Sequence, residues 1–143
     1  MKISGKSIPP KVLLEEAHAL ATRGKTEEAS ARYQACIQAY LDKGLPLRAL
    51  AAAKAARSAL GDNPKIQALL ARTYTSLGLS GDAQKEYHAG ATMIAKDAIP
   101  LLRGLDQMEV LDFLDIMDLM PVKRGAWILK QGEKGEDIYL VAA

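Results

Sequence analysis

Residues 64–97 read PKIQALLARTYTSLGLSGDAQKEYHAGATMIAKD, and this stretch decides the fold that the sequence predicts. Its two halves place apolar and small residues at helical spacing, and the turn signal Gly78-Leu79-Ser80-Gly81 separates them. Pro64 suits the first turn of a helix, where no backbone N–H is needed, and Gly78 suits the position just past a helix end. The stretch therefore predicts two helices joined by a tight turn, over about 64–77 and 80–95.

Similar turn signals occur earlier in the sequence, at 23–25, 42–46 and 61–64. Alanine, the strongest helix former, occurs 24 times, and 20 of these residues lie between Ala17 and Ala95. Three further helices are predicted over about 10–23, 26–42 and 46–60. Helices of this length joined by short turns pack as antiparallel hairpins, so we expect a mainly α-helical array. Its expected core residues are Leu13, Leu20, Tyr33, Ile37, Tyr40, Leu69, Leu70, Tyr74 and Tyr87.

Residues 30–63 align without gaps on residues 64–97, and the alignment brings Tyr40 onto Tyr74 and Gly44 onto Gly78. The spacing between these two ranges, and the recurrence of a tyrosine and a glycine at matching positions, resemble the tetratricopeptide repeat, a helix-turn-helix unit. The resemblance covers residues 10–97. Five helices do not divide into whole pairs, so one of them must be a cap or a departure from the pattern.

Two positions of residues 64–97 depart from the tetratricopeptide pattern. Gln67 stands where the family has tryptophan, and Gly90 stands where alanine is usual. The resemblance implies an α–α superhelix that binds a protein or peptide partner on a concave side lined by the first helices of its repeats. Carried over to this sequence, that partner-binding side consists of Gln34, Gln38, Asp42, Lys65, Ala68, Arg72, Thr75 and Ser76.

The cations of this side, Lys65 and Arg72, would hold an acidic peptide or a carboxylate through charge-assisted hydrogen bonds. The alternative is a helical spacer that has no ligand of its own. On the first interpretation the chain is a protein–protein interaction or scaffold module of a regulatory protein.

The sequence after residue 97 changes character. A short helix or turn is expected from Pro100 to about Gly104, followed by an amphipathic helix over 107–119 that Met120-Pro121 ends. Short β-type runs at 126–130 and 137–141 flank the turn signal of 132–135. The expected solvated acidic face of the 107–119 helix consists of Asp106, Glu109, Asp112, Asp115 and Asp118.

The spacing of Gly125, Ile128, Gly132-Glu133-Lys134-Gly135-Glu136-Asp137 and Ile138-Tyr139-Leu140-Val141 resembles the beginning of a cyclic nucleotide-binding domain of the catabolite-activator type. This resemblance extends from the 107–119 helix to the end of the sequence and implies a β-roll. The family holds the nucleotide phosphate with groups further downstream, so we expect no cyclic nucleotide binding by this truncated chain. In a longer parent the module would be coupled to a cyclic nucleotide sensor.

The expected organisation has four parts: a flexible N-terminus (1–9), a helical repeat domain (10–97), connecting helices (98–120) and an incomplete β-roll (121–143). An incomplete β-roll has unpaired edges and uncovered apolar faces, which a second copy of the chain could cover. The alternative function is therefore self-association as a homodimer. Its expected contacts are Phe113, Leu114, Met117, Trp127, Ile128, Ile138 and Leu140.

Charge and motifs exclude other classes. Residues 1–97 carry a formal charge of +5 and residues 98–143 one of −3, and the total of +2 is too small for a nucleic-acid binder. No nucleophile elbow, P-loop or zinc spacing is present, so we expect no enzyme, cofactor or metal site. No segment suits a signal peptide or a spanning helix, which predicts a cytoplasmic protein without a membrane partner. Arg48, Lys54 and Arg57 are expected to form a solvated basic edge on the 46–60 helix, the alternative being contact with an acidic partner or nucleic acid. His18 and His88 are expected to be ordinary helix residues and Cys36 a buried packing residue.

Overall fold

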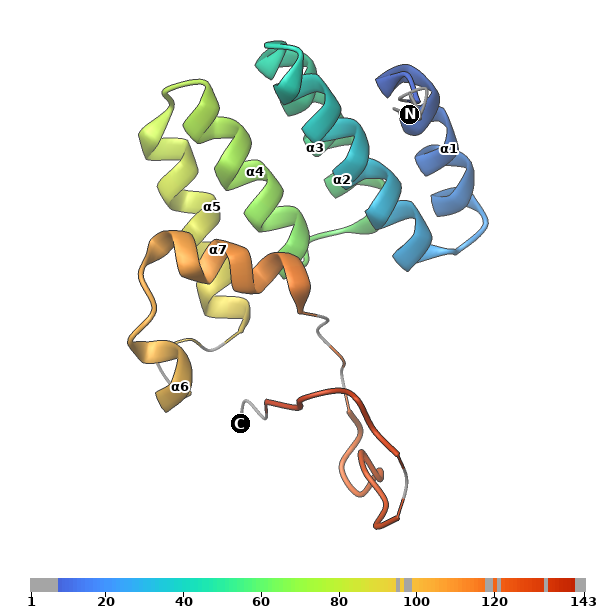
Figure 1. Ribbon diagram of the computed structural model, residues 1–143, viewed down its shortest axis with the longest axis vertical. Helices are drawn as coiled ribbons and strands as arrows, with labels where there is room; N and C mark the ends of the chain where they lie inside the picture. The colour runs from blue at the N-terminus through green and yellow to red at the C-terminus, as the bar shows by residue number, and fades with distance from the viewer. Residues whose placement is uncertain are drawn as a thin grey trace, which may run out of the picture.

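The computed structural model describes residues 8–94, 96, 99–117, 120, 122–132 and 134–140, and its regular elements are α-helices (Figure 1). The helices are α1 (Pro10–Thr22), α2 (Thr26–Asp42), α3 (Pro46–Leu60), α4 (Pro64–Ser76), α5 (Ser80–Met93), α6 (Pro100–Arg103) and α7 (Gln107–Ile116). Most of the N-terminus that was expected to be flexible lies outside the described residues.

The bounds of α1 to α5 confirm the five helices predicted from sequence to within two residues, because local signals set their ends. Pro10, Pro46 and Pro64 occupy the first turns of α1, α3 and α4. The Asn63 side chain caps α4 by accepting a hydrogen bond from the backbone N–H of Ile66 at 3.0 Å. These helices thus begin where the sequence removes or satisfies a free N–H.

The turns that follow α2 and α4 have the same geometry. Gly44 and Gly78 take left-handed backbone conformations, with φ of 66° and 72°. The N–H of Leu45 donates to the carbonyl of Tyr40, and the N–H of Leu79 donates to the carbonyl of Tyr74, both at 2.9 Å. This is the bonding pattern of a helix end that closes over a glycine. The turn that follows α1 has the same form, with φ of 74° at Gly24 and the N–H of Lys25 donating to the carbonyl of Leu20 at 3.0 Å, so the geometry follows from the glycine at each helix end.

Two clusters of buried apolar residues hold the helices together. The first joins α1, α2, α3 and one side of α4, and it includes Tyr33, Ile37 and Leu70. The second joins the other side of α4, through Ala68 and Ala71, to residues of α6 and α7. All nine residues expected in the core belong to one of these clusters or pack against it, with Leu20, Tyr40, Tyr74 and Tyr87 only partly buried.

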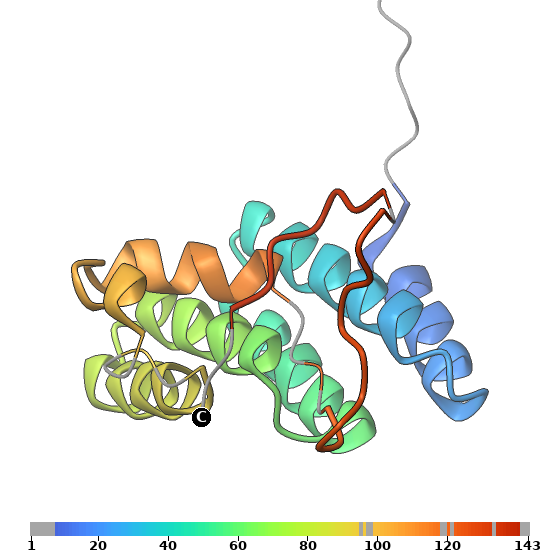
Figure 2. The same cartoon turned by 90° about the horizontal axis from the view of Figure 1, so that it is seen from below.

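The α4 helix contributes residues to both clusters, and α7 packs directly on it. Figure 1 shows α7 crossing the α4/α5 hairpin, and Figure 2 shows it seated on α4. The closest packing of α7 is with α4, followed by α5. None of the helices in the described ranges is long and apolar enough to cross a membrane.

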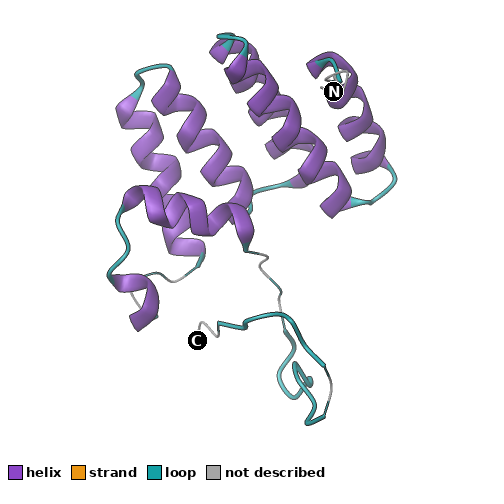
Figure 3. Ribbon diagram, in the orientation of Figure 1, coloured by secondary structure: helices purple, strands orange, loops and turns teal. Residues whose placement is uncertain are grey.

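The expected C-terminal strands are not seen, which corrects the sequence prediction. Residues 122–132 and 134–140 are exposed loop and turn, without strand in this described part of the chain (Figure 3). A two-stranded hairpin that buries no face is marginal in water, which explains why β propensity alone does not produce strands here. Val141 lies outside the described residues.

The amphipathic helix expected over 107–119 is also shorter than predicted. It ends at Ile116, because Met117 takes an extended backbone with φ −89° and ψ 151°. Asp118 and Leu119 lie outside the described residues.

Candidate functional site

The predicted partner-binding residues of α2 lie on its exposed side. Gln34, Gln38 and Asp42 are all exposed, and Gln38 Nε2 donates to Asp42 Oδ1 at 2.7 Å. Their recurrence at every fourth position places them along one stripe of the helix. This stripe is open to a partner.

Two grooves lie beside the N-terminal part of α2, before the stripe of Gln34, Gln38 and Asp42. One, of about 460 Å³, lies between α1 and α2, where Arg32 Nε is 3.2 Å from Glu16 Oε2. The other, of about 150 Å³, lies between the first turns of α2 and α4 and reaches Met117 after α7. Since Ser30 lines one groove and Ala31 the other, Gln34 follows beyond both, on the next turn of the helix. No pattern in the sequence predicted these grooves.

The predicted residues of α4 have a different environment. Thr75 and Ser76 are exposed, and their hydroxyls donate to the carbonyls of Ala71 and Arg72 at 2.9 and 3.0 Å. Ala68 is fully buried in the second cluster, beneath α7. The Ala68 part of the predicted surface is therefore occupied by a helix of the same chain.

Arg72 joins α4 to two carboxylates of α7. Its Nη2 atom lies 2.5 Å from Asp112 Oδ1 and 3.0 Å from Asp115 Oδ2. Val110, Leu111 and Leu114 of α7 are buried on the same side of the helix. The contact thus combines an apolar stripe with a charged clamp, which is how an amphipathic helix binds in a groove.

Within the described residues, the charged contact of Arg72 with Asp112 and Asp115 leaves some of its polar atoms without hydrogen bonds. Burial raises the pKa of Asp115, and the neighbouring Asp112 adds to this, while Arg72 and Lys65 act in the opposite direction. In the described part of the chain, Asp115 Oδ1 and Arg72 Nε are buried without a hydrogen-bond partner. Desolvation of unpaired polar atoms costs free energy, so the clamp gives α7 specificity more than strength.

The expectation of a solvated acidic face on α7 needs correction. Asp106 and Glu109 are exposed but form a capping box, with bonds of 2.9 Å to the Glu109 N–H and 2.8 Å to the Asp106 N–H. Asp112 is exposed yet paired, and the side chain of Asp115 is only 21% exposed. Two of the acids therefore face α4 because Arg72 and the apolar stripe draw that side of α7 inward.

Gly90 of α5 makes room for α7. A Cβ atom at this position would lie 2.8 Å from Leu114 Cδ1 and 3.2 Å from Gln67 Cβ. Leu114 is fully buried, so only glycine admits it without a shift of its neighbours. The departure from alanine at Gly90 was the sequence signal for this contact.

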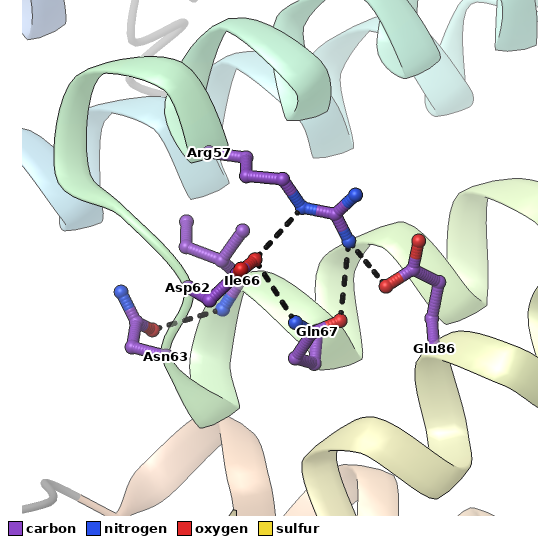
Figure 4. Close-up of polar contacts among 6 residues, drawn as sticks. All are labelled: Arg57, Asp62, Asn63, Ile66, Gln67 and Glu86. Atoms are coloured by element: carbon purple, nitrogen blue, oxygen red, sulfur yellow. Dashed lines mark hydrogen bonds and ion pairs between the residues drawn. The ribbon is translucent and has the colours of Figure 1, made fainter.

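A second polar cluster links α3, α4 and α5 (Figure 4). Arg57 Nε lies 3.0 Å from Asp62 Oδ1, while Arg57 Nη2 donates to Gln67 Oε1 at 3.2 Å and pairs with Glu86. Gln67 Nε2 donates to Asp62 Oδ1 at 3.1 Å. Arg57 is therefore a structural cross-link rather than part of a solvated basic edge, whereas Arg48 and Lys54 are exposed as expected.

The side chains of His18, His88 and Cys36 each contact a polar neighbour within the described ranges. His18 Nδ1 lies 2.8 Å from the Tyr33 hydroxyl, and His88 Nε2 lies 3.0 Å from Gln84 Nε2. Cys36 is buried and its thiol donates to the carbonyl of Pro10 at 3.2 Å, and burial raises its pKa. Across the same residues, no three His, Cys, Asp or Glu side chains gather to hold a metal ion.

The predicted dimer contacts fall into two groups. Leu114 is buried and Phe113 and Met117 pack against the second cluster, so these three serve packing within one chain. Exposed large side chains make up the second group: Trp127, Ile128, Ile138 and Leu140.

No protein-family model matches this sequence, and no curated protein or solved structure matches it at a significant level.

Proposed function

We propose that this chain is a protein-interaction module of the tetratricopeptide-like helical type, with its partner side on α2 and α4. The observation that carries the proposal is α7 itself, an amphipathic helix seated on the side of α4 that was assigned to a partner. Short turns closed over Gly24, Gly44 and Gly78 support the interpretation as packed helical hairpins. Coupling to a cyclic nucleotide sensor in a longer, cytoplasmic parent remains part of this proposal.

The surface that is open to a partner is the exposed stripe of α2. It presents amide and carboxylate groups at Gln34, Gln38 and Asp42, and two grooves lie beside the first two turns of the same helix. Polar side chains fix the orientation of a bound peptide, and adjacent grooves accept its side chains. The stripe therefore suits a protein segment laid along α2.

A display library of random peptides, selected against the immobilised full chain, tests the function. We expect enriched peptides whose affinity, measured by calorimetry, falls about tenfold when Gln38→Arg is introduced, which corresponds to about 1.4 kcal/mol. Lys54→Glu, an exposed charge change on α3, is the control and should leave the affinity unchanged. Absence of any peptide that binds more tightly than its scrambled version would remove the proposal.

A second function, self-association, is favoured by the exposed apolar side chains after α7. Trp127 and Ile138 are 80% and 90% exposed, and such side chains gain from being covered by a second copy. Light scattering behind size-exclusion chromatography should give a dimer for the full chain and a monomer for the variant Trp127→Asp with Ile138→Asp. A monomer for both chains would exclude self-association through these residues.

A further inference from the structure

We propose that α7 is a built-in occupant of the α4 surface, which in the activated module takes an acidic amphipathic helix of a partner protein in its place. This inference rests on the proposed function and names the kind of partner that the α4 side recognises. The seat for such a helix is made by Ala68, Ala71 and Arg72 of α4 together with Gly90 of α5.

The seat defines the chemistry of its occupant. The two alanines and Gly90 leave space for large aliphatic side chains, which Val110, Leu111 and Leu114 fill. Arg72 is half-buried and paired with two carboxylates, so it requires negative charge at two positions of the occupant. A helix with aliphatic residues at positions i, i+1 and i+4, and with aspartates at positions i+2 and i+5, would satisfy both requirements.

The connection to α7 allows it to leave without unfolding the array. The first cluster, which holds α1, α2, α3 and one side of α4 together, includes no residue of α7, whereas Leu102 of α6 and Ile94 lie in the second cluster and lose part of their cover when α7 leaves. Gly104, Leu105 and Asp106 connect α6 to α7, with Gly104 and Asp106 exposed. The hinge therefore lies between Leu102 and α7.

The α7 helix is held mainly by its seat. It has only ten residues, a length at which an isolated helix is marginal in water. Asp115 Oδ1 and Arg72 Nε lack hydrogen-bond partners in the described structure, so a longer helix with better-placed acids could outcompete α7. Such a helix can bind only to chains in which α7 has left the seat, so its apparent affinity is its intrinsic affinity multiplied by the fraction of such chains.

The probe for this proposal is a labelled peptide with the sequence of residues 105–117, LDQMEVLDFLDIM, titrated into the full chain and followed by fluorescence anisotropy. We expect weak binding to the wild-type chain. Leu114→Ala loosens α7 of the chain but not the peptide, so it should tighten binding about tenfold or more. Ile116→Ala, on the same helix at a side chain that is 78% exposed, should bind like the wild type.

Charge exchange tests the clamp. In the Leu114→Ala background, Arg72→Glu should weaken peptide binding about tenfold, and a peptide carrying Asp112→Lys and Asp115→Lys should recover it. Equal affinity of the wild type and Leu114→Ala, or binding that ignores Arg72→Glu, would overturn the proposal. A wild-type dimer that Leu114→Ala dissociates would also overturn it, because α7 of a second copy would then be the occupant.

The library selection separates this inference from the proposed function. If Gln38→Arg weakens binding of the selected peptides but Leu114→Ala does not change the affinity of the probe, the proposal of an interaction module stands and only the proposed role of α7 is excluded. Failure of both the selection and the probe would remove the proposed function as well.

Discussion

Replacing Gly90, which contacts Leu114, by alanine has two opposite effects on the free energy of unfolding. Gly90→Ala raises helix propensity within α5, which is worth about 1 kcal/mol at an open helical position. Its Cβ would lie 2.8 Å from Leu114 Cδ1 and 3.2 Å from Gln67 Cβ, in a site where Leu114 is fully buried. Overpacking of this kind costs about 1–3 kcal/mol. We therefore expect Gly90→Ala to lower the free energy of unfolding by up to about 2 kcal/mol.

Urea unfolding of four chains measures this balance: the wild type, each single variant, and the double variant of Gly90→Ala and Leu114→Ala. Leu114→Ala alone should cost about 2–5 kcal/mol through its cavity. The new Cβ partly fills that cavity, so the double variant should be more stable than the sum of the single effects by about 1–2 kcal/mol.

The matched control is Gly81→Ala in the same helix, because no atom lies within 4 Å of a Cβ built there. It should be neutral or stabilising by up to about 1 kcal/mol. The reasoning would be refuted if Gly90→Ala stabilised the chain as Gly81→Ala does, or if Gly90→Ala and Leu114→Ala were additive. Either result would mean that α7 does not press on α5 at Gly90.

Four further predictions concern single side chains. Arg57→Ala should destabilise the chain to urea by about 1–3 kcal/mol because Glu86 loses its partner, and Arg57→Lys should restore less than half of this. Asp106→Ala should cost about 0.5–2 kcal/mol by removing the cap of α7, with Asp106→Asn nearly neutral in the same assay. Because the folded pKa of Asp115 is raised, its contribution to the free energy of unfolding falls as pH rises through and above about 4; urea unfolding of Asp115→Asn at several pH values should lack this fall. The buried thiol of Cys36 should react with a thiol-specific dye only at the rate of chain opening, so a rate equal to that of a free thiol would contradict its burial.

The helices of the array were predictable because their ends are decided locally. Pro64 and Asn63 begin α4, and Gly78 ends it, through bonds between residues close in sequence. Such signals act before any tertiary contact forms, so sequence reasoning placed α1 to α5 within two residues of their positions. The large buried residues, such as Tyr33, follow from the same helical spacing.

The role of α7 was not predictable from local signals. The pair between Arg72 and Asp112 joins residues far apart in sequence, whereas the sequence pattern predicted that Arg72 would hold a carboxylate of a partner. Gly90 was noted as a departure, yet nothing along the chain indicated that Leu114 fills the space. The expected strands failed for the related reason that β propensity needs a covered face to act on.

The two parts of the proposed partner side therefore differ in what they would demand of a ligand. Arg72 is already balanced by two aspartates, so while α7 is seated its charge is not offered to a partner. The stripe of Gln34, Gln38 and Asp42 on α2 is open and carries no cation, so its ligand needs hydrogen bonds rather than acidic groups. Only a partner that displaces α7 meets the free guanidinium, and its affinity should fall steeply as salt screens that charge. Binding to α2 should depend weakly on salt, which makes the two modes separable in one protein.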